Sequence, residues 1–187
     1  MDKVKESLKK YTLSVEKLCL LWEGLAKRAT KSMCEIETLS EQLLAATNIS
    51  GDAPMICEQF PDLHTHLIYQ IFVALEKELE LLNCIVHEVG ENTDSLNKLA
   101  LQIQCMRICT DYVPPLSISM IMEYISDSTQ YFRAQYATLK IALLSLDFRD
   151  GLSVKNLRNA FFEPSDLKAH IQCCRQIGTN ILSSIDS

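Results

Sequence analysis

"VKESLKKYTLSVEKLCLLWEGLAKRAT", residues 4–30, places an apolar residue at alternating steps of four and three. From Val4 the same spacing continues to Ala46, and twelve of the thirteen positions are apolar or aromatic. An apolar row with an average spacing of 3.5 residues is typical of a helix that packs in a coiled coil or a helical bundle. The run "TNISGDAP" at 47–54, rich in turn-forming residues, predicts the end of this first helix.

The rest of the chain carries the same kind of pattern in four further segments. We expect helices at about 2–47, 62–109, 117–146, 153–162 and 165–185. The spacing stays in phase across Gly90, which favours one helix there, although a break at Gly90 would give two shorter ones. The run "DFRDGLS" at 147–153 predicts a break at Gly151. The predicted fold is all-α: an elongated antiparallel helical bundle or coiled coil of three long helices plus short C-terminal helices. We expect it to form a single helical domain over residues 1–187.

Composition narrows the classes of function. The chain is 48% apolar, with five glycines and five prolines, which favours a helical core over glycine-rich phosphate loops. A net charge of −6 makes direct nucleic-acid binding and binding to an anionic membrane surface unfavourable. No apolar run reaches the roughly 18 residues needed to span a bilayer, and the basic start is not followed by the apolar core of a secretory signal. We therefore expect a protein of the nucleus and cytoplasm with no membrane partner.

The sequence offers little chemistry for catalysis or metal binding. Without a signal peptide, the eight cysteines are interpreted as buried thiols, and no CxxC pair occurs. Cys57, His64 and His66 lack the fourth ligand of a closed zinc site. Arg175 follows two cysteines and could lower a thiol pKa, but no histidine completes a nucleophile there. The glutamates within 76–80 follow the spacing of a solvated face. We predict no catalytic, cofactor-binding or metal-binding residue.

The helix predicted at 117–146 is apolar on more than one face. Phe132 and Tyr136 lie on one face, and Tyr124 and Tyr131 lie on another. A helix with a single buried stripe needs an apolar band of only about 100°. The two longer helices would also extend well beyond this one, because they reach roughly 65–70 Å against about 45 Å. Large uncovered apolar strips usually mark a partner site.

We therefore predict that part of this helix packs against a partner helix. The candidate interface residues are Tyr124, Tyr131, Tyr136, Ser128 and Gln135. Tyrosine buries a large ring and keeps its hydroxyl at the rim of an interface, and polar residues in an apolar row can fix register. Trp22 and Phe132 are interpreted as core. In the alternative interpretation the C-terminal helices fold back over the excess apolar surface, and the monomer is self-sufficient.

Several stretches resemble, in matching order, one known family. They are "LW" at 21–22 with "LSEQLLAATN" at 39–48, "FPDL" at 60–63, and "MEYISDSTQYFRAQYATLKIALLSL" at 122–146. Together they resemble the AIRIM family of ribosome maturation factors, which interact with an AAA+ ATPase, over most of residues 7–150. The stretch "LCLLWEGL" at 18–25 also resembles the start of the sibling CINP family.

The AIRIM resemblance implies a non-enzymatic adaptor. Such a chain pairs with a CINP-like helical protein and docks on a hexameric AAA+ ATPase. It acts in maturation of the large ribosomal subunit precursor and touches the pre-ribosomal particle only indirectly. Three alternatives stay open: a CINP-like cell-cycle or replication factor, a coiled-coil scaffold or tether of another complex, and an enzyme with an unrecognised site.

Overall fold

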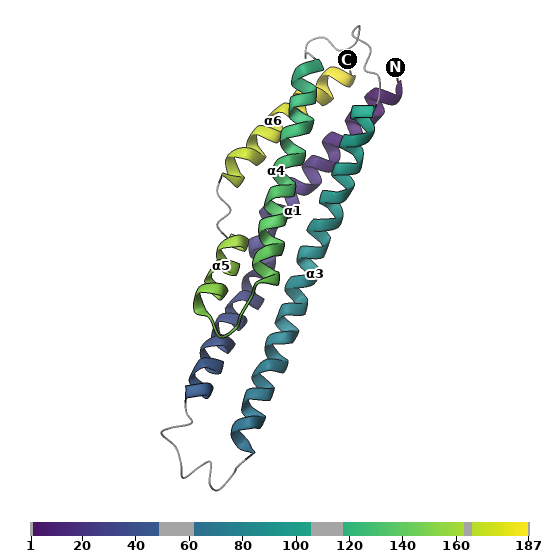
Figure 1. Ribbon diagram of the computed structural model, residues 1–187. Helices are drawn as coiled ribbons and strands as arrows, with labels where there is room; N and C mark the ends of the chain where they lie inside the picture. The colour runs from purple at the N-terminus through teal and green to yellow at the C-terminus, as the bar shows by residue number, and fades with distance from the viewer. Residues whose placement is uncertain (1, 49–61, 106–117, 163–165, 187) are drawn as a thin grey trace. The chain divides into compact units, whose positions relative to one another are not determined.

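The computed structural model describes residues 2–48, 62–105, 118–162 and 166–186 (Figure 1). Its helices are α1 (Asp2–Asn48), α3 (Leu63–Cys105), α4 (Ile118–Leu144), α5 (Gly151–Phe162) and α6 (Leu167–Asp186). The described residues contain no strand. The prediction of an all-α helical bundle is confirmed.

The first helix forms as its apolar row predicts. Helix α1 is continuous over its 47 residues. From Leu8 to Ala46 every position of the row is buried except Leu39, which is half-buried. The predicted core residue Trp22 is among the buried ones. Gly24 lies within the helix without breaking it.

Helix α3 is one helix across Gly90, as the in-phase apolar row predicts, and the alternative break does not occur. The ring of Tyr136 on α4 lies directly against this glycine. A Cβ atom at position 90 would lie 2.7 Å from the Tyr136 hydroxyl oxygen, which is closer than nonbonded atoms approach. Gly90 therefore costs α3 some helix propensity but lets α4 pack closely.

The connection between α4 and α5 differs from the prediction at Gly151. This glycine is the first residue of α5 and lies inside the helix, while the break covers Ser145–Asp150. Asp150 caps the helix, because its Oδ1 accepts a hydrogen bond of 2.9 Å from the Leu152 amide. The expected continuation of the second helix to 109 and the expected start of the third at 117 lie outside the described residues.

The chain divides into two compact units, and the long helices contribute to both. Unit 1 consists of Met1–Gly24, His87–Thr138 and Pro164–Ser187. Unit 2 consists of Leu25–Val86 and Leu139–Glu163. The prediction of a single domain over residues 1–187 concerns how these units pack together, and it stays a prediction.

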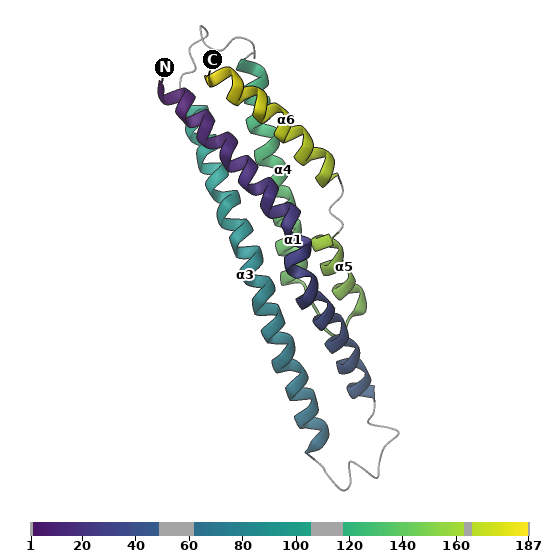
Figure 2. The same ribbon diagram turned by 180° about the vertical axis from the view of Figure 1, so that it is seen from behind.

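In unit 1, helix α6 covers α1 and α4. Lys5 Nζ of α1 donates a 3.3 Å hydrogen bond to the Ile185 carbonyl oxygen near the end of α6, whereas Gly178 lies against Thr12. The two helices are therefore antiparallel, and Figures 1 and 2 both draw α6 beside the first half of α1. A C-terminal helix thus folds back over the apolar surface of α1 and α4 in unit 1, an arrangement that the sequence left open as an alternative.

Unit 2 contains the later part of α1, the first part of α3, the end of α4 and all of α5. His64 Nε2 lies 2.8 Å from the Ala46 carbonyl oxygen, so the start of α3 is held against the end of α1. Arg158 of α5 contacts both carboxylate oxygens of Glu37, at 2.8 and 2.7 Å. The core between these helices is almost entirely apolar. It includes Met33, Ile36, Leu43, Leu75, Leu82 and Leu157.

Candidate functional site

A buried hydroxyl cluster joins α1 to α4 inside unit 1. The Tyr11 hydroxyl donates a 2.9 Å hydrogen bond to the Ile125 carbonyl oxygen. It also lies 2.7 Å from Ser128 Oγ and 2.8 Å from Thr129 Oγ1. Burial raises the pKa of Tyr11 to about 12, and the hydrogen bonds with Ser128 and Thr129 oppose that shift. This phenol is therefore neutral near pH 7, and its contacts fix the register of α1 against α4.

Tyr124, a predicted interface residue, lies in the core beside this cluster. Its ring meets the Tyr11 ring edge-on, with centroids 6.0 Å apart. A Cβ atom at Gly178 would lie 3.3 Å from its hydroxyl oxygen and 2.9 Å from Thr12 Cγ2, so the glycine lets α6 pack closely at this point. This hydroxyl is buried and has no hydrogen-bond partner among the described residues. Burial raises the pKa of Tyr124 well above its ordinary value.

Tyr131 contacts the first turn of α6. Its ring stacks on His170, with centroids 3.6 Å apart and planes 17° apart, and Phe132 meets the same imidazole edge-on. Burial lowers the pKa of His170, while the negative charge of Asp127 opposes that shift. Burial also raises the pKa of Tyr131, and a hydrogen bond with Gln135 opposes it. The predicted site residues Tyr131 and Gln135 therefore lie together, next to α6.

The structure separates the five predicted interface residues into two groups. Tyr124 and Ser128 are buried, with exposed fractions of 5% and 0%, and they pack on the chain's own helices. In this structure α1 and α6 cover these two residues, and their place in a partner interface stays a prediction. Tyr131, Gln135 and Tyr136 are half-buried. For these three a partner interface stays a prediction.

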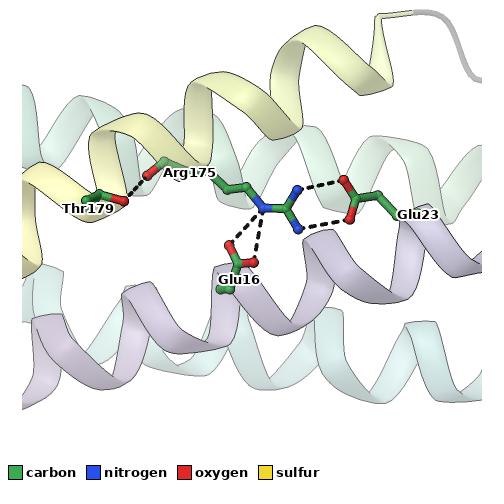
Figure 3. Close-up of polar contacts among 4 residues, drawn as sticks. All are labelled: Glu16, Glu23, Arg175 and Thr179. Atoms are coloured by element: carbon green, nitrogen blue, oxygen red, sulfur yellow. Dashed lines mark hydrogen bonds and ion pairs between the residues drawn. The ribbon is translucent and has the colours of Figure 1, made fainter.

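An arginine on α6 binds two glutamates of α1 (Figure 3). Arg175 Nε lies 3.0 and 3.1 Å from the two carboxylate oxygens of Glu16. Its Nη1 and Nη2 lie 2.6 and 2.9 Å from the oxygens of Glu23. Two-point contact of guanidinium with carboxylate gives directional hydrogen bonds as well as charge attraction. Arg175 thus fixes the position of α6 along α1.

Sequence reasoning missed the roles of Tyr11 and Arg175. A signal for Tyr11 was present, because polar residues at two apolar-row positions, Tyr11 and Ser128, can satisfy each other across a helix pair. The partners of Arg175 had no comparable signal. Glu16 and Glu23 lie about 150 residues away in sequence and follow the spacing of an ordinary charged face.

Two buried thiols in unit 1 are unsuited to nucleophilic chemistry. Burial raises the pKa of Cys19 and of Cys174 to about 12 in each case. Both thiols are therefore protonated near pH 7, and a protonated thiol is a poor nucleophile and metal ligand. Arg175, which the sequence placed as a possible activator, is bound to its glutamates instead.

The described parts of the chain show neither a metal-binding cluster nor a membrane-spanning segment. No three His, Cys, Asp or Glu side chains gather there in a way that could hold an ion. Cys57 of the weighed metal set lies outside the described residues. Among the described helices, none is long and apolar enough to cross a membrane.

Comparison with known proteins places the chain in a family. The sequence profile of the ribosome biogenesis family described as C1orf109-like matches residues 2–172. The chain belongs to the C1orf109-like family. The match covers α1, α3, α4 and α5 and ends within α6. This agrees with the resemblance to ribosome maturation factors in the sequence.

A curated human relative of this C1orf109-like chain is named AFG2-interacting ribosome maturation factor. The two sequences are 25% identical over 169 residues, which cover 84% of this chain and 83% of the relative. The similarity therefore extends over both units.

Proposed function

We propose that this chain is a non-enzymatic adaptor in maturation of the large ribosomal subunit precursor. It pairs with a second helical protein, of the CINP-like kind, and docks on a hexameric AAA+ ATPase. It contacts the pre-ribosomal particle through these partners and works in the nucleus and cytoplasm.

The observation that carries this proposal is the extent of the similarity to the human maturation factor. That relative is named for its interaction with AFG2, and the match spans more than four-fifths of both chains. A family of ribosome biogenesis proteins matched over residues 2–172 supports the same process. The descriptions of the family and of the human relative support a role in ribosome maturation and an interaction with an AAA+ ATPase. Pairing with a helical protein rests on the resemblance in sequence, and the exposed apolar side chains of unit 2 support it.

The chemistry of the interior supports an adaptor without catalysis. The buried thiols of Cys19 and Cys174 are protonated near pH 7. The buried hydroxyls of Tyr11 and Ser128 each donate a hydrogen bond to a backbone carbonyl oxygen of α4. These polar groups fix helix register. None is arranged as a nucleophile beside a base, the arrangement that covalent catalysis needs.

Affinity purification of the tagged chain from its own cells tests the proposal. We expect a stoichiometric small helical protein, an AAA+ ATPase and proteins of the large-subunit precursor, each identified by mass spectrometry. Depletion of the chain should lead to accumulation of that precursor. Recovery of a filament or membrane tether without the ATPase would instead support a scaffold role and contradict the adaptor proposal.

A further inference from the structure

The outward side of the first half of α1 combines exposed leucines with lysines. At about 100° per residue, six positions of α1 in unit 1 fall within a sector of about 100°, opposite the buried row that runs through Leu18 and Trp22. In Figure 2 this half of α1 lies in front, between α3 and α6. We define the outer face of α1 as these six residues: Lys9, Lys10, Leu13, Lys17, Leu20 and Gly24.

Two leucines occupy the middle of the outer face of α1. Leu13 and Leu20 are seven residues apart, so their directions differ by only about 20°. Their exposed fractions are 55% and 57%. Leucines at a spacing of seven are typical of a helix that packs against another helix. Further along α1 the same side carries the exposed residues Glu35, Thr38 and Gln42, which suit contact with water.

The packing of this chain does not explain Gly24. Among the described residues, no neighbouring atom lies within 4 Å of a Cβ atom placed there, whereas at Gly90 and Gly178 such an atom would meet a side chain at 2.7 and 2.9 Å. A glycine inside a helix lowers the stability of the helix relative to alanine. Glycine is favoured where another chain approaches the backbone closely. Gly24 lies one turn beyond Leu20 on the same side, and it leaves space there for the backbone of a partner.

The edges of the outer face of α1 are basic, although the net charge of the chain is −6. Lys9 lies on one side of the two leucines, and Lys10 and Lys17 lie on the other. Residues 2–31 contain eight of the 18 Lys and Arg residues of the chain but only four of its 24 Asp and Glu residues. The next exposed cations on the same side of α1 are Lys27, Arg28 and Lys31.

The acidic residues nearest to this face bind cations of the chain itself. Glu6 Oε1, at the start of the face, lies 2.6 Å from Lys10 Nζ. Glu16 and Glu23, at the edge towards α6, both bind Arg175. The surface is therefore apolar in its middle and positively charged along its edges. An acidic helix complements such a surface, because its carboxylates lie against the lysines while its apolar side chains cover the leucines.

We propose that the outer face of α1 binds an acidic amphipathic helix of a partner protein. Apolar side chains of that helix pack on Leu13 and Leu20, its backbone approaches Gly24, and Asp or Glu on its flanks face Lys9 and Lys17. From Lys9 to Gly24 the face is about 23 Å long, which corresponds to about four turns of helix. This inference deepens the proposed function and rests on it, because it assigns a surface and a charge pattern to the pairing with a helical protein.

The chemistry of the face disfavours other occupants. In a symmetric pair of two copies, lysines would face lysines. RNA would neutralise the lysines but leave Leu13 and Leu20 without apolar contacts, and the outer face of α1 has no aromatic side chain on which a base could stack. A membrane surface binds a helix through a broad apolar face, and the broad apolar face of α1 is buried in the bundle.

Photo-cross-linking from single positions tests the surface directly. Benzoylphenylalanine is placed at Leu20 in the tagged full-length chain, and at Leu101 as a control, since Leu101 is 53% exposed on α3 in unit 1. We expect position 20 to cross-link to one protein, through a peptide that has apolar residues at helical spacing with Asp or Glu beside them. Position 101 should give no such product.

Variants then measure the contributions of the leucines and the lysines. We expect the double variant Leu13→Ser and Leu20→Ser to lower recovery of the partner about tenfold or more, because a few apolar side chains carry most of the affinity of an interface. The control Leu101→Ser should leave recovery unchanged. Lys17→Glu should lower recovery about fivefold by charge repulsion, whereas Lys98→Glu, at an exposed position of α3, should not. Circular dichroism should show the same helix content in all variants.

Gly24→Leu separates partner binding from the stability of the chain. The free chain has room for this side chain, and leucine has a higher helix propensity than glycine, so the midpoint of thermal unfolding should equal or exceed that of the wild type. The same side chain would hold a partner helix away from α1, and we expect recovery to fall about tenfold. Undiminished recovery would contradict the close approach of a partner at Gly24.

The outcomes separate this inference from the proposed function. If the Leu13/Leu20 variant recovers the helical partner and the ATPase at wild-type levels, the inference is wrong and the proposed function stands. A cross-link from position 20 to a second copy, to RNA or to lipid also overturns it. If the wild-type chain recovers an acidic helical partner that depends on the outer face of α1, but no ATPase, the proposed function fails and the inference stands. Recovery of no partner overturns both.

Discussion

The part of α3 in unit 1 and the part in unit 2 keep the same buried row but differ on their outward flank. In unit 1 the side of α3 away from its buried row carries His87, Glu91, Ser95 and Lys98, whereas in unit 2 the same side includes the exposed apolar residues Tyr69 and Val73. Of the twelve exposed large apolar side chains in the described residues, eight belong to unit 2. A regular apolar row builds the bundle in both units. The side of α3 away from the buried row is not fixed by that row, and its residues differ between the two units.

The interiors of the two units also differ, because unit 1 buries more polar side chains than unit 2. Unit 1 buries Thr12, Thr93, Ser128 and Thr129 together with the Tyr11 hydroxyl, and most of these groups are hydrogen-bonded. The buried polar side chains of unit 2 are Ser32 and Ser40. Buried hydrogen bonds specify one register more strictly than apolar packing does. Buried hydrogen bonds thus fix the helix register of unit 1, whereas unit 2 has an almost entirely apolar interior and more exposed apolar side chains.

Truncating a core ring of unit 1 should produce the largest effect on stability. Phe132→Ala removes a fully buried ring that packs against Tyr131 and His170. We expect the free energy of unfolding to fall by about 3–5 kcal/mol, since a cavity adds to the lost burial. Trp22 is the only tryptophan and is buried in unit 1, so its fluorescence during urea unfolding reports on this unit.

The control for Phe132→Ala is Val73→Ala, at an exposed position of α3 in unit 2. Because Val73 is exposed in the chain alone, its truncation should change the unfolding free energy by no more than about 0.5 kcal/mol. Equal losses in the two variants would show that the exposed residues of unit 2 are core after all. That result would erase the distinction between the units.

Removing one hydroxyl should produce a smaller loss. Tyr11→Phe keeps the ring against Tyr124 and deletes the oxygen that contacts Ile125, Ser128 and Thr129. We expect a loss of about 1–2 kcal/mol, typical of a buried hydrogen-bonded group. The same substitution at exposed Tyr69 in unit 2 is the matched control and should be neutral. A neutral Tyr11→Phe would mean that register in unit 1 depends on apolar packing alone.

The sequence predicted the helices well because the apolar rows are long and regular. The row from Leu8 to Ala46 and its counterpart on α3 each keep one phase, and a phase error would expose a whole face of the helix. The fold-back of α6 could not be predicted in the same way. It depends on long-range pairs such as Gly178 with Tyr124 and Arg175 with Glu16, which leave no periodic trace in the sequence.

The same limit applies to the interface predicted on α4, which stays a prediction. The number of apolar faces on α4 indicated that other helices pack against it. It did not indicate whether those helices belong to this chain or to a partner. Tyr124 and Ser128 turned out to face α1 and α6, whereas the exposed apolar side chains belong mostly to α3 and the rest of unit 2.

The smallest expected effect concerns pH and isolates the contact between α4 and α6. Burial lowers the folded-state pKa of His170 below its ordinary value of 6.5, against the opposing charge of Asp127 on α4. Below about pH 6.5 the unfolded chain therefore binds more protons at this position than the folded chain. The stability that neutral His170 provides is present above that pH and is lost as the pH falls towards the folded-state pKa.

His170→Phe tests this by keeping an aromatic ring on Tyr131 while removing the titrating group. Unfolding is followed by Trp22 fluorescence between pH 5.0 and 7.5 in both proteins. The wild-type free energy should fall more steeply on acidification than that of the variant. The difference in slope should stay below about 1.4 kcal/mol per pH unit, the limit for a single proton. Because Trp22 and His170 both belong to unit 1, a difference seen by fluorescence would assign the effect to the docking of α6 in that unit. Parallel slopes would show that the imidazole titrates in the folded chain as it does in the unfolded one, and that its stack on Tyr131 leaves it open to water.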